Sequence, residues 1–137
     1  MPFVNVKLVK QQISAETKQL LIEGIQDIIV NIMGRNKDLT VITLDEIDSA
    51  NWYIGGQPIS ANGSKHGKLI SVEIHISKGT SNPDQMLEVI RAGRALVSRI
   101  LGSCDTTNYF IIHELNPDSW GFDGISMTER NKQESRK

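Results

Sequence analysis

The sequence predicts an α+β fold: a tandem β-α-β repeat with a four-stranded, mostly parallel sheet and two helices on one face. Three observations predict it. Trp52 and Trp120 lie 68 positions apart, in similar segments that close on glycine. The same offset, applied without a gap, aligns apolar positions across most of both halves. Each half has an alternating apolar stretch followed by apolar residues at helical spacing.

The first unit is expected to cover residues 2–56. Apolar and polar residues alternate over 4–8, which is typical of a half-buried strand. Ser14 is a good helix N-cap, and the apolar stripe that follows stops at Gly34, a natural C-terminal cap. A second strand is predicted over residues 40–47.

The second unit is expected to cover residues 69–127 and repeats this pattern. A strand is predicted around 72–77, and Asn82 followed by proline begins a helix. That helix ends at Gly102, and residues 108–115 form the last long strand.

The two units are predicted to make one domain. The polar Gly/Ser-rich stretch 57–68 joins them, and the charged tail 128–137 is expected to fray. Each unit should pair its strands in parallel through a right-handed crossover, and the units should join edge to edge. Both helices then cover one face of the sheet. The other face is left bare, which predicts oligomerisation.

Composition and charge exclude several classes of protein. The chain has 137 residues, with 15 Lys plus Arg against 16 Asp plus Glu, a formal net charge of -1. This balance gives no footprint for nucleic acid or for an anionic membrane. No signal peptide or membrane-spanning run is visible, and a lone cysteine favours a reducing compartment, so a cytoplasmic protein is expected.

Pro2 is the residue most able to carry chemistry. Methionine before proline is normally removed, which would leave a free secondary amine at the start of a strand. In an apolar pocket the pKa of such an amine falls toward neutrality, where it serves as a general base or a nucleophile. The simpler alternative is that Pro2 is merely a terminal residue.

Five segments resemble the tautomerase superfamily, specifically the 4-oxalocrotonate tautomerase (4-OT) group in its fused form. They are residues 2–8 and 52–56 in the first unit and residues 73–79, 111–115 and 120–122 in the second. The resemblance covers about nine-tenths of the chain. It implies the tautomerase fold and assembly as a homotrimer.

The resemblance also implies a function. The protein would be a keto–enol tautomerase of a small α-keto or enol acid, without cofactor or metal, with Pro2 as the general base. Trp52 and Trp120 map onto the aromatic residue that keeps the proline site apolar and stacks on the substrate; packing over the hairpin is the alternative role. Ile70 takes the place of the proline in the second unit, so one proline site per chain is expected.

The sequence departs from the family at the substrate-binding arginines. The position after the first strand is Gln12, with Thr80 as its repeat partner, and the position on the later strand is Val41, with Tyr109 as its partner. The fork that grips a carboxylate is therefore missing from its usual places.

Three other residues are candidates for substrate binding. Lys10 could act as a point charge, although a solvated surface lysine is the simpler reading. Tyr109 and Asn108 could donate hydrogen bonds to a carbonyl, or could only pack within the strand.

Two alternative functions stay open. A hydratase- or dehalogenase-like lyase would use the same proline to protonate carbon while a carboxylate or tyrosine positions water. A catalytically idle, oligomeric binding protein would explain the missing arginines. The three histidines are scattered and suggest no metal site.

Overall fold

The computed structural model describes residues 2–10, 13–62 and 66–135. Each half contains two long strands with a long helix between them. They are β1 (Phe3–Val9), α1 (Ala15–Met33) and β2 (Val41–Ile47), then β5 (Ile70–Ser77), α2 (Pro83–Leu101) and β6 (Tyr109–Leu115). The short elements are η1 (Lys37–Leu39), η2 (Ser49–Asn51), β3 (Tyr53–Ile54), β4 (Gln57–Pro58), η3 (Ile59–Asn62), β7 (Gly121–Phe122), β8 (Ile125–Ser126) and α3 (Met127–Ser135).

Both long helices begin and end where the sequence predicts. The Ser14 hydroxyl accepts the backbone N–H of Thr17 at 3.1 Å, and Gly34 closes α1 with a left-handed φ of 66°. Asn82 caps α2 through the backbone N–H of Gln85 at 2.8 Å, in a reciprocal capping box.

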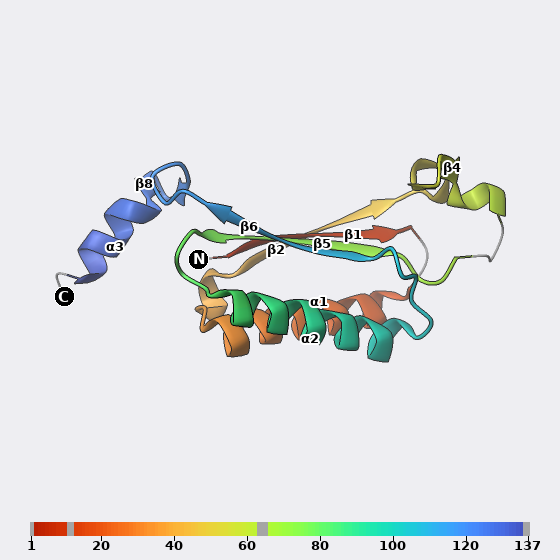
Figure 1. The fold of residues 1–137 in the computed structure, drawn as a ribbon, viewed down its shortest axis with the longest axis horizontal. Coiled ribbons are helices and arrows are strands. Elements are labelled where there is room, and N and C mark those ends of the chain that lie inside the picture. The colour runs from red at the N-terminus through yellow and green to blue at the C-terminus, as the bar shows by residue number, and fades with distance from the viewer. Residues whose placement is uncertain (1, 11–12, 63–65, 136–137) are drawn as a thin grey trace.

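The sheet has the order β2-β1-β5-β6. β1 pairs with β2 in parallel and β5 pairs with β6 in parallel, while the central pair β1–β5 is antiparallel. The two units therefore join edge to edge but run in opposite directions, so the chain that follows β6 returns to the end where β1 begins. Figure 1 shows this end on the left, with the N-terminus, β8 and α3 together.

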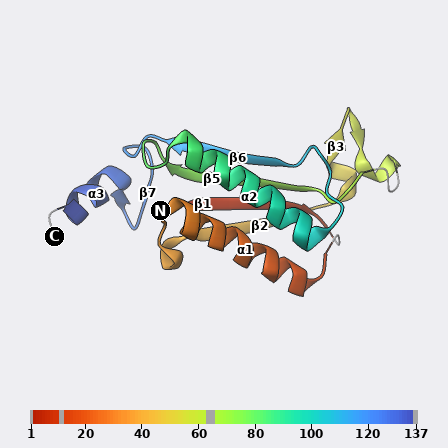
Figure 2. The ribbon, with the colours of Figure 1, turned by 60° about the horizontal axis from the view of Figure 1, so that its bottom comes forward.

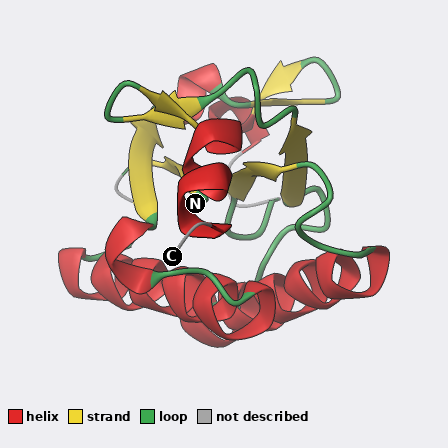
Figure 3. Ribbon diagram, turned by 90° about the vertical axis from the view of Figure 1, so that its left-hand side faces the viewer, coloured by secondary structure: helices red, strands yellow, loops and turns green. Residues whose placement is uncertain are grey.

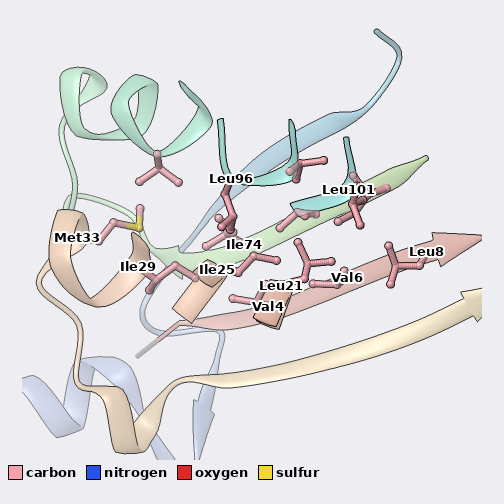
Figure 4. Packing of buried hydrophobic residues seen from close by; sticks show 14 of the residues in the cluster. Val4, Val6, Leu8, Leu21, Ile25, Ile29, Met33, Ile74, Leu96 and Leu101 are labelled. Carbon is pink, nitrogen blue, oxygen red and sulfur yellow. The ribbon is translucent and has the colours of Figure 1, made fainter. Parts of the chain in front are cut away.

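The core lies between one face of the sheet and the two helices, which pack side by side (Figure 2). Alternate residues of β1 and β5 point into it and meet one stripe from each helix. Figure 4 shows the packing, which includes Val4, Val6, Leu8, Leu21, Ile25, Ile29, Ile74, Leu96 and Leu101.

A polar network crosses the other face of the sheet. Lys7 donates to Asn5 at 2.8 Å and lies 3.7 Å from the Glu73 carboxylate. His113 contacts the same carboxylate at 3.3 Å and stacks on His75, with ring centroids 4.6 Å apart. The predicted bare face is thus present, and its centre is polar.

Each unit ends in a short hairpin with a two-residue turn. The turn of β3–β4 is Gly55-Gly56, with φ of 61° and 79°. The turn of β7–β8 is Asp123-Gly124, with φ of 55° and 72°. Positive φ at both turn positions matches the twist of paired strands and favours glycine or aspartate.

The structure differs from the sequence-based expectation at two places. Gln57 and Pro58 pair with Tyr53 and Ile54, so the hairpin extends into the stretch expected to be linker. The expectation that the charged tail frays is also wrong, because residues 127–135 form the helix α3. The Ser126 hydroxyl accepts the N–H of Glu129 at 3.1 Å, and these local contacts hold the start of the helix.

Candidate active site

A pocket of about 300 Å³ opens at the end of the molecule where β1 begins. Figure 3 views the molecule from this end. The pocket is lined by four segments: the start of β1, η1 with the start of β2, β7, and the start of α3. Its residues are mostly apolar and comprise Pro2, Phe3, Asp38, Leu39, Val41, Trp120, Gly121, Phe122 and Met127.

Pro2 is buried at the start of β1. Its carbonyl accepts the backbone N–H of Val41 at 3.4 Å, which extends the β1–β2 pairing by one residue. The ring is thereby held by the sheet itself. A substrate in the pocket would meet Pro2 on a rigid strand rather than on a loop.

Trp120 is fixed by two hydrogen bonds. Its indole Nε1–H donates to the hydroxyl of Ser77 at 2.9 Å, and its carbonyl accepts the N–H of Met127 at 2.9 Å. Ser77 is itself buried. Because an indole has a single donor, Trp120 offers the pocket an apolar ring surface and no further hydrogen bond.

The antiparallel junction explains why Trp120 lies beside Pro2. Trp120 follows β6, which runs parallel to β5, and β5 runs antiparallel to β1. The end of β6 therefore lies at the start of β1. Each unit places its tryptophan at the first strand residue of the other unit, so Trp52 belongs to the end where β5 begins.

The other residues expected to bind substrate lie at that opposite end of the sheet. Lys10 follows β1 and donates its backbone N–H to Ile47 at 2.7 Å. Asn108 accepts the N–H of Ile70 at 3.1 Å and donates to the carbonyl of Lys68 at 3.0 Å. Tyr109 is exposed and pairs with Ser71. Trp52 also follows a strand that ends there. Of the five residues, Trp120 is the one that lines the pocket with Pro2 within the described part of one chain.

The arginine positions of the family hold other side chains. Val41 lines the pocket and adds apolar surface to it. Thr80 accepts a hydrogen bond from Arg35 at 2.8 Å. Gln12 lies outside the described residues.

Sequence reasoning missed three pocket residues, namely Asp38, Leu39 and Met127. Asp38 is an exposed carboxylate on η1, whose backbone N–H donates to Asn36 at 2.9 Å. Met127 is buried at the start of α3. No motif marks these residues. Asp38 and Leu39 precede β2, which runs parallel to β1 and therefore starts at the Pro2 end, whereas the antiparallel junction brings Met127 there.

Two further findings, on metal sites and on membrane-spanning helices, apply to the described residues. Over 2–10, 13–62 and 66–135, no group of three or more His, Cys, Asp or Glu side chains is arranged to hold a metal ion. In the same ranges no helix is both long and apolar enough to cross a bilayer.

Comparison with known proteins identifies the first unit. A family model described as "Tautomerase enzyme" matches residues 2–62. A probable tautomerase of Helicobacter pylori is 44% identical over 61 residues, which cover 43% of this chain and 90% of that relative. "Probable tautomerase K2" of Dickeya dadantii is 40% identical over 60 residues, covering 44% of this chain and 90% of the relative.

The chain belongs to the tautomerase family.

Solved structures extend the likeness of this chain to both units. A native fused 4-OT superposes with a TM-score of 0.82 at 17% identity, covering 92% of this chain and 96% of that one. A wild-type fused 4-OT asymmetric trimer gives a TM-score of 0.79 at 20% identity, with the same coverage. A malonate semialdehyde decarboxylase gives 0.74 at 14% identity, covering 96% of each chain. The fold is therefore that of a fused, two-unit member of the tautomerase superfamily.

Proposed function

We propose that this tautomerase catalyses keto–enol tautomerisation of a small α-keto or enol acid, without a cofactor. After removal of Met1, the secondary amine of Pro2 is the general base. The amine takes the proton of the enol hydroxyl, and the resulting ammonium returns a proton to the neighbouring carbon. The observation that carries the proposal is a buried Pro2 in an apolar pocket beside the fixed indole of Trp120.

The lining of the pocket acts on the charge of the amine in two ways. The apolar side chains of Phe3, Leu39, Val41 and Trp120 would disfavour the ammonium by desolvation, whereas the exposed Asp38 carboxylate would favour it. The same surface would stack on the apolar part of an unsaturated acid. The family supports this chemistry, since curated relatives of the first unit are probable tautomerases.

We further propose a cytoplasmic homotrimer. The fold neighbours include symmetric and asymmetric trimers of fused 4-OT proteins. In a trimer the face that carries the polar network would meet neighbouring subunits. Trp52, Tyr109, Asn108 and Lys10 could contribute to a proline site only if a neighbour brings its opposite end there.

The test compares the parent with Pro2→Ala in the ketonisation of phenylenolpyruvate, after intact mass has shown that Met1 is absent from both. We expect the variant to lose at least about a hundredfold in kcat/KM, the scale of a general base. Pro58→Ala is the matched control, because Pro58 lies in β4 at the other end of the sheet. A Pro2→Ala variant as active as the parent would sink the proposal.

One observation favours a second candidate, a hydratase-like lyase. Asp38 lines the pocket of Pro2, where a carboxylate could orient water while the ammonium of Pro2 protonates carbon. An assay for water addition to an unsaturated acid, run on the same proteins, separates the two reactions. Hydration without ketonisation by the parent would replace the first proposal with this one.

A further inference from the structure

A second pocket, of about 230 Å³, adjoins the proline pocket. The two pockets are neighbours because Leu39 and Met127 line both. Unlike the first, the second pocket is largely polar, and its walls carry two arginines. Arg35 follows the C-cap of α1, and Arg130 lies on α3.

Within the described part of the chain, the hydrogen bonds of the Arg35 guanidinium go to uncharged acceptors. Its Nη2 donates to the Thr80 hydroxyl at 2.8 Å, the Thr80 carbonyl at 3.3 Å and the Ser81 hydroxyl at 3.1 Å. Its Nε is buried and has no hydrogen-bond partner among the described residues. Burial lowers the pKa of the Arg35 guanidinium, because loss of solvent disfavours its charged form.

Arg130 also has one paired and one unpaired group on its guanidinium. Its Nη2 donates to the carbonyl of Phe122 at 3.1 Å, and the guanidinium carbon lies 3.8 Å from the centre of the Phe122 ring. Stacking of this kind fixes the plane of the guanidinium. Its Nε is also buried, and no acceptor for it exists within the described part of the chain.

Neither arginine forms an ion pair with a carboxylate of the described residues. Glu134 also lines the pocket, but it is exposed and makes no ion pair with either guanidinium. Buried, unpaired N–H groups on charged side chains are costly, and an anion that accepts from them relieves this cost. A guanidinium matches the planar, two-oxygen geometry of a carboxylate.

We propose that Arg35 and Arg130 form an anion subsite for the carboxylate of an acid whose apolar part lies in the proline pocket. The subsite stands on the two unpaired arginines; that its ligand is the substrate rests on the proposed function. Neither arginine occupies the positions of Gln12 or Val41, where the resemblance expects one. The subsite would give the enzyme a preference for acids over neutral analogues.

The test measures binding of 3-phenylpropanoate, an unreactive acid, by isothermal titration calorimetry, with 3-phenylpropanamide as the uncharged analogue. We expect the parent to bind the acid at least about tenfold more tightly than the amide. Arg130→Gln and Arg35→Gln should each weaken acid binding by about tenfold or more and leave amide binding unchanged. Arg91→Gln, an exposed arginine of α2, is the matched control and should leave both constants unchanged.

Several outcomes would overturn the subsite. They are equal affinities of the parent for acid and amide, no binding of the acid by the parent, or unchanged acid binding in Arg130→Gln. Loss of the trimer with unchanged acid binding would assign the arginines to a subunit contact instead. Arg35 links α1 to the loop before α2, so a folded Arg130→Gln carries the test if Arg35→Gln unfolds.

The subsite and the proposed reaction fail separately. Arginine-dependent binding of the acid, with Pro2→Ala as active as the parent, upholds the subsite and removes the proline mechanism. The opposite result is loss of ketonisation in Pro2→Ala together with unchanged acid binding and KM in the arginine variants. It would uphold the proline mechanism and remove the subsite.

Discussion

Trp120 and Trp52 occupy equivalent places in the repeat, yet only the first lies beside Pro2 within one chain. Trp120 is oriented by a buried serine, Ser77, through a bond of 2.9 Å. The carbonyl of Trp52 accepts the N–H of Ile59 at 2.9 Å, which closes its own hairpin. Both tryptophans accept a backbone hydrogen bond that closes their own hairpin, but only the hairpin of Trp120 lines the pocket of Pro2 within the described part of one chain.

This difference predicts unequal effects on catalysis. Trp120→Ala should lower kcat/KM for phenylenolpyruvate by about tenfold or more, because it removes aromatic contact with the substrate and lets water reach the amine. Trp52→Ala should leave kcat/KM within about twofold of the parent. Thermal midpoints of both variants check that folding is intact. A larger loss with Trp52→Ala would show that a neighbouring subunit brings its opposite end to the proline.

At the scale of elements, two glycines allow close packing around α2. An added Cβ at Gly93 would lie 2.4 Å from Cε1 of Phe110 on β6, and one at Gly24 would lie 2.5 Å from Cδ1 of Leu96. The first contact is with a rigid ring and the second with the end of a flexible side chain. Both glycines sit in helix interiors, where alanine has the better propensity.

The two glycines are therefore expected to respond differently to alanine. Gly93→Ala should lower the free energy of unfolding by about 1–2 kcal/mol, because overpacking against the ring exceeds the gain in helix propensity. Gly24→Ala should cost less, since Leu96 can change rotamer. Urea denaturation at equal protein concentration measures both. A Gly93→Ala protein more stable than the parent would contradict the close contact.

The elements themselves were accessible from the sequence, because their signals are local. Ser14, Gly34 and Asn82 cap helices where cap chemistry predicts, and the alternating stretches are strands. The helix α3 was missed because charge alone suggested fraying. Ser126 caps its start and Arg130 stacks on the nearby Phe122, and the Ser126 cap is a local signal that the sequence offered.

At the scale of the whole molecule, the direction of the second unit decides the composition of the site. The repeat identifies Pro2 and Trp120 as candidates, but either a parallel or an antiparallel junction fits the same local pattern. The antiparallel β1–β5 pairing unites these two residues and separates Pro2 from Tyr109, Asn108 and Lys10. Arg35 and Arg130 line one pocket for the same reason. Sequence reasoning named Pro2 and Trp120, which line the pocket, and the pairing of the strands supplied the other lining residues.

The polar face of the sheet leads to a prediction about assembly. Sedimentation equilibrium of the parent should give the mass of a trimer. Lys7→Glu places a second carboxylate beside Glu73 of the same subunit, which Lys7 approaches to 3.7 Å, and should weaken the trimer because unpaired negative charge would then have to be buried at the covered face. Asp27→Lys, an exposed change on α1, should leave the mass unchanged. A monomeric parent would contradict the proposed assembly.

The hairpin of the second unit lies at the start of the first unit, and this arrangement has a consequence for how the two repeats can diverge in sequence. The repeat that lost its amine, with Ile70 in place of proline, is not the repeat that loses the use of its tryptophan. With Pro2 as the proposed base, selection at Pro2 would act on the hairpin of the second unit, which carries Trp120, and not on Trp52 in its own unit. Removal of the second unit would take Trp120 away from the proline pocket, so each unit would constrain the other.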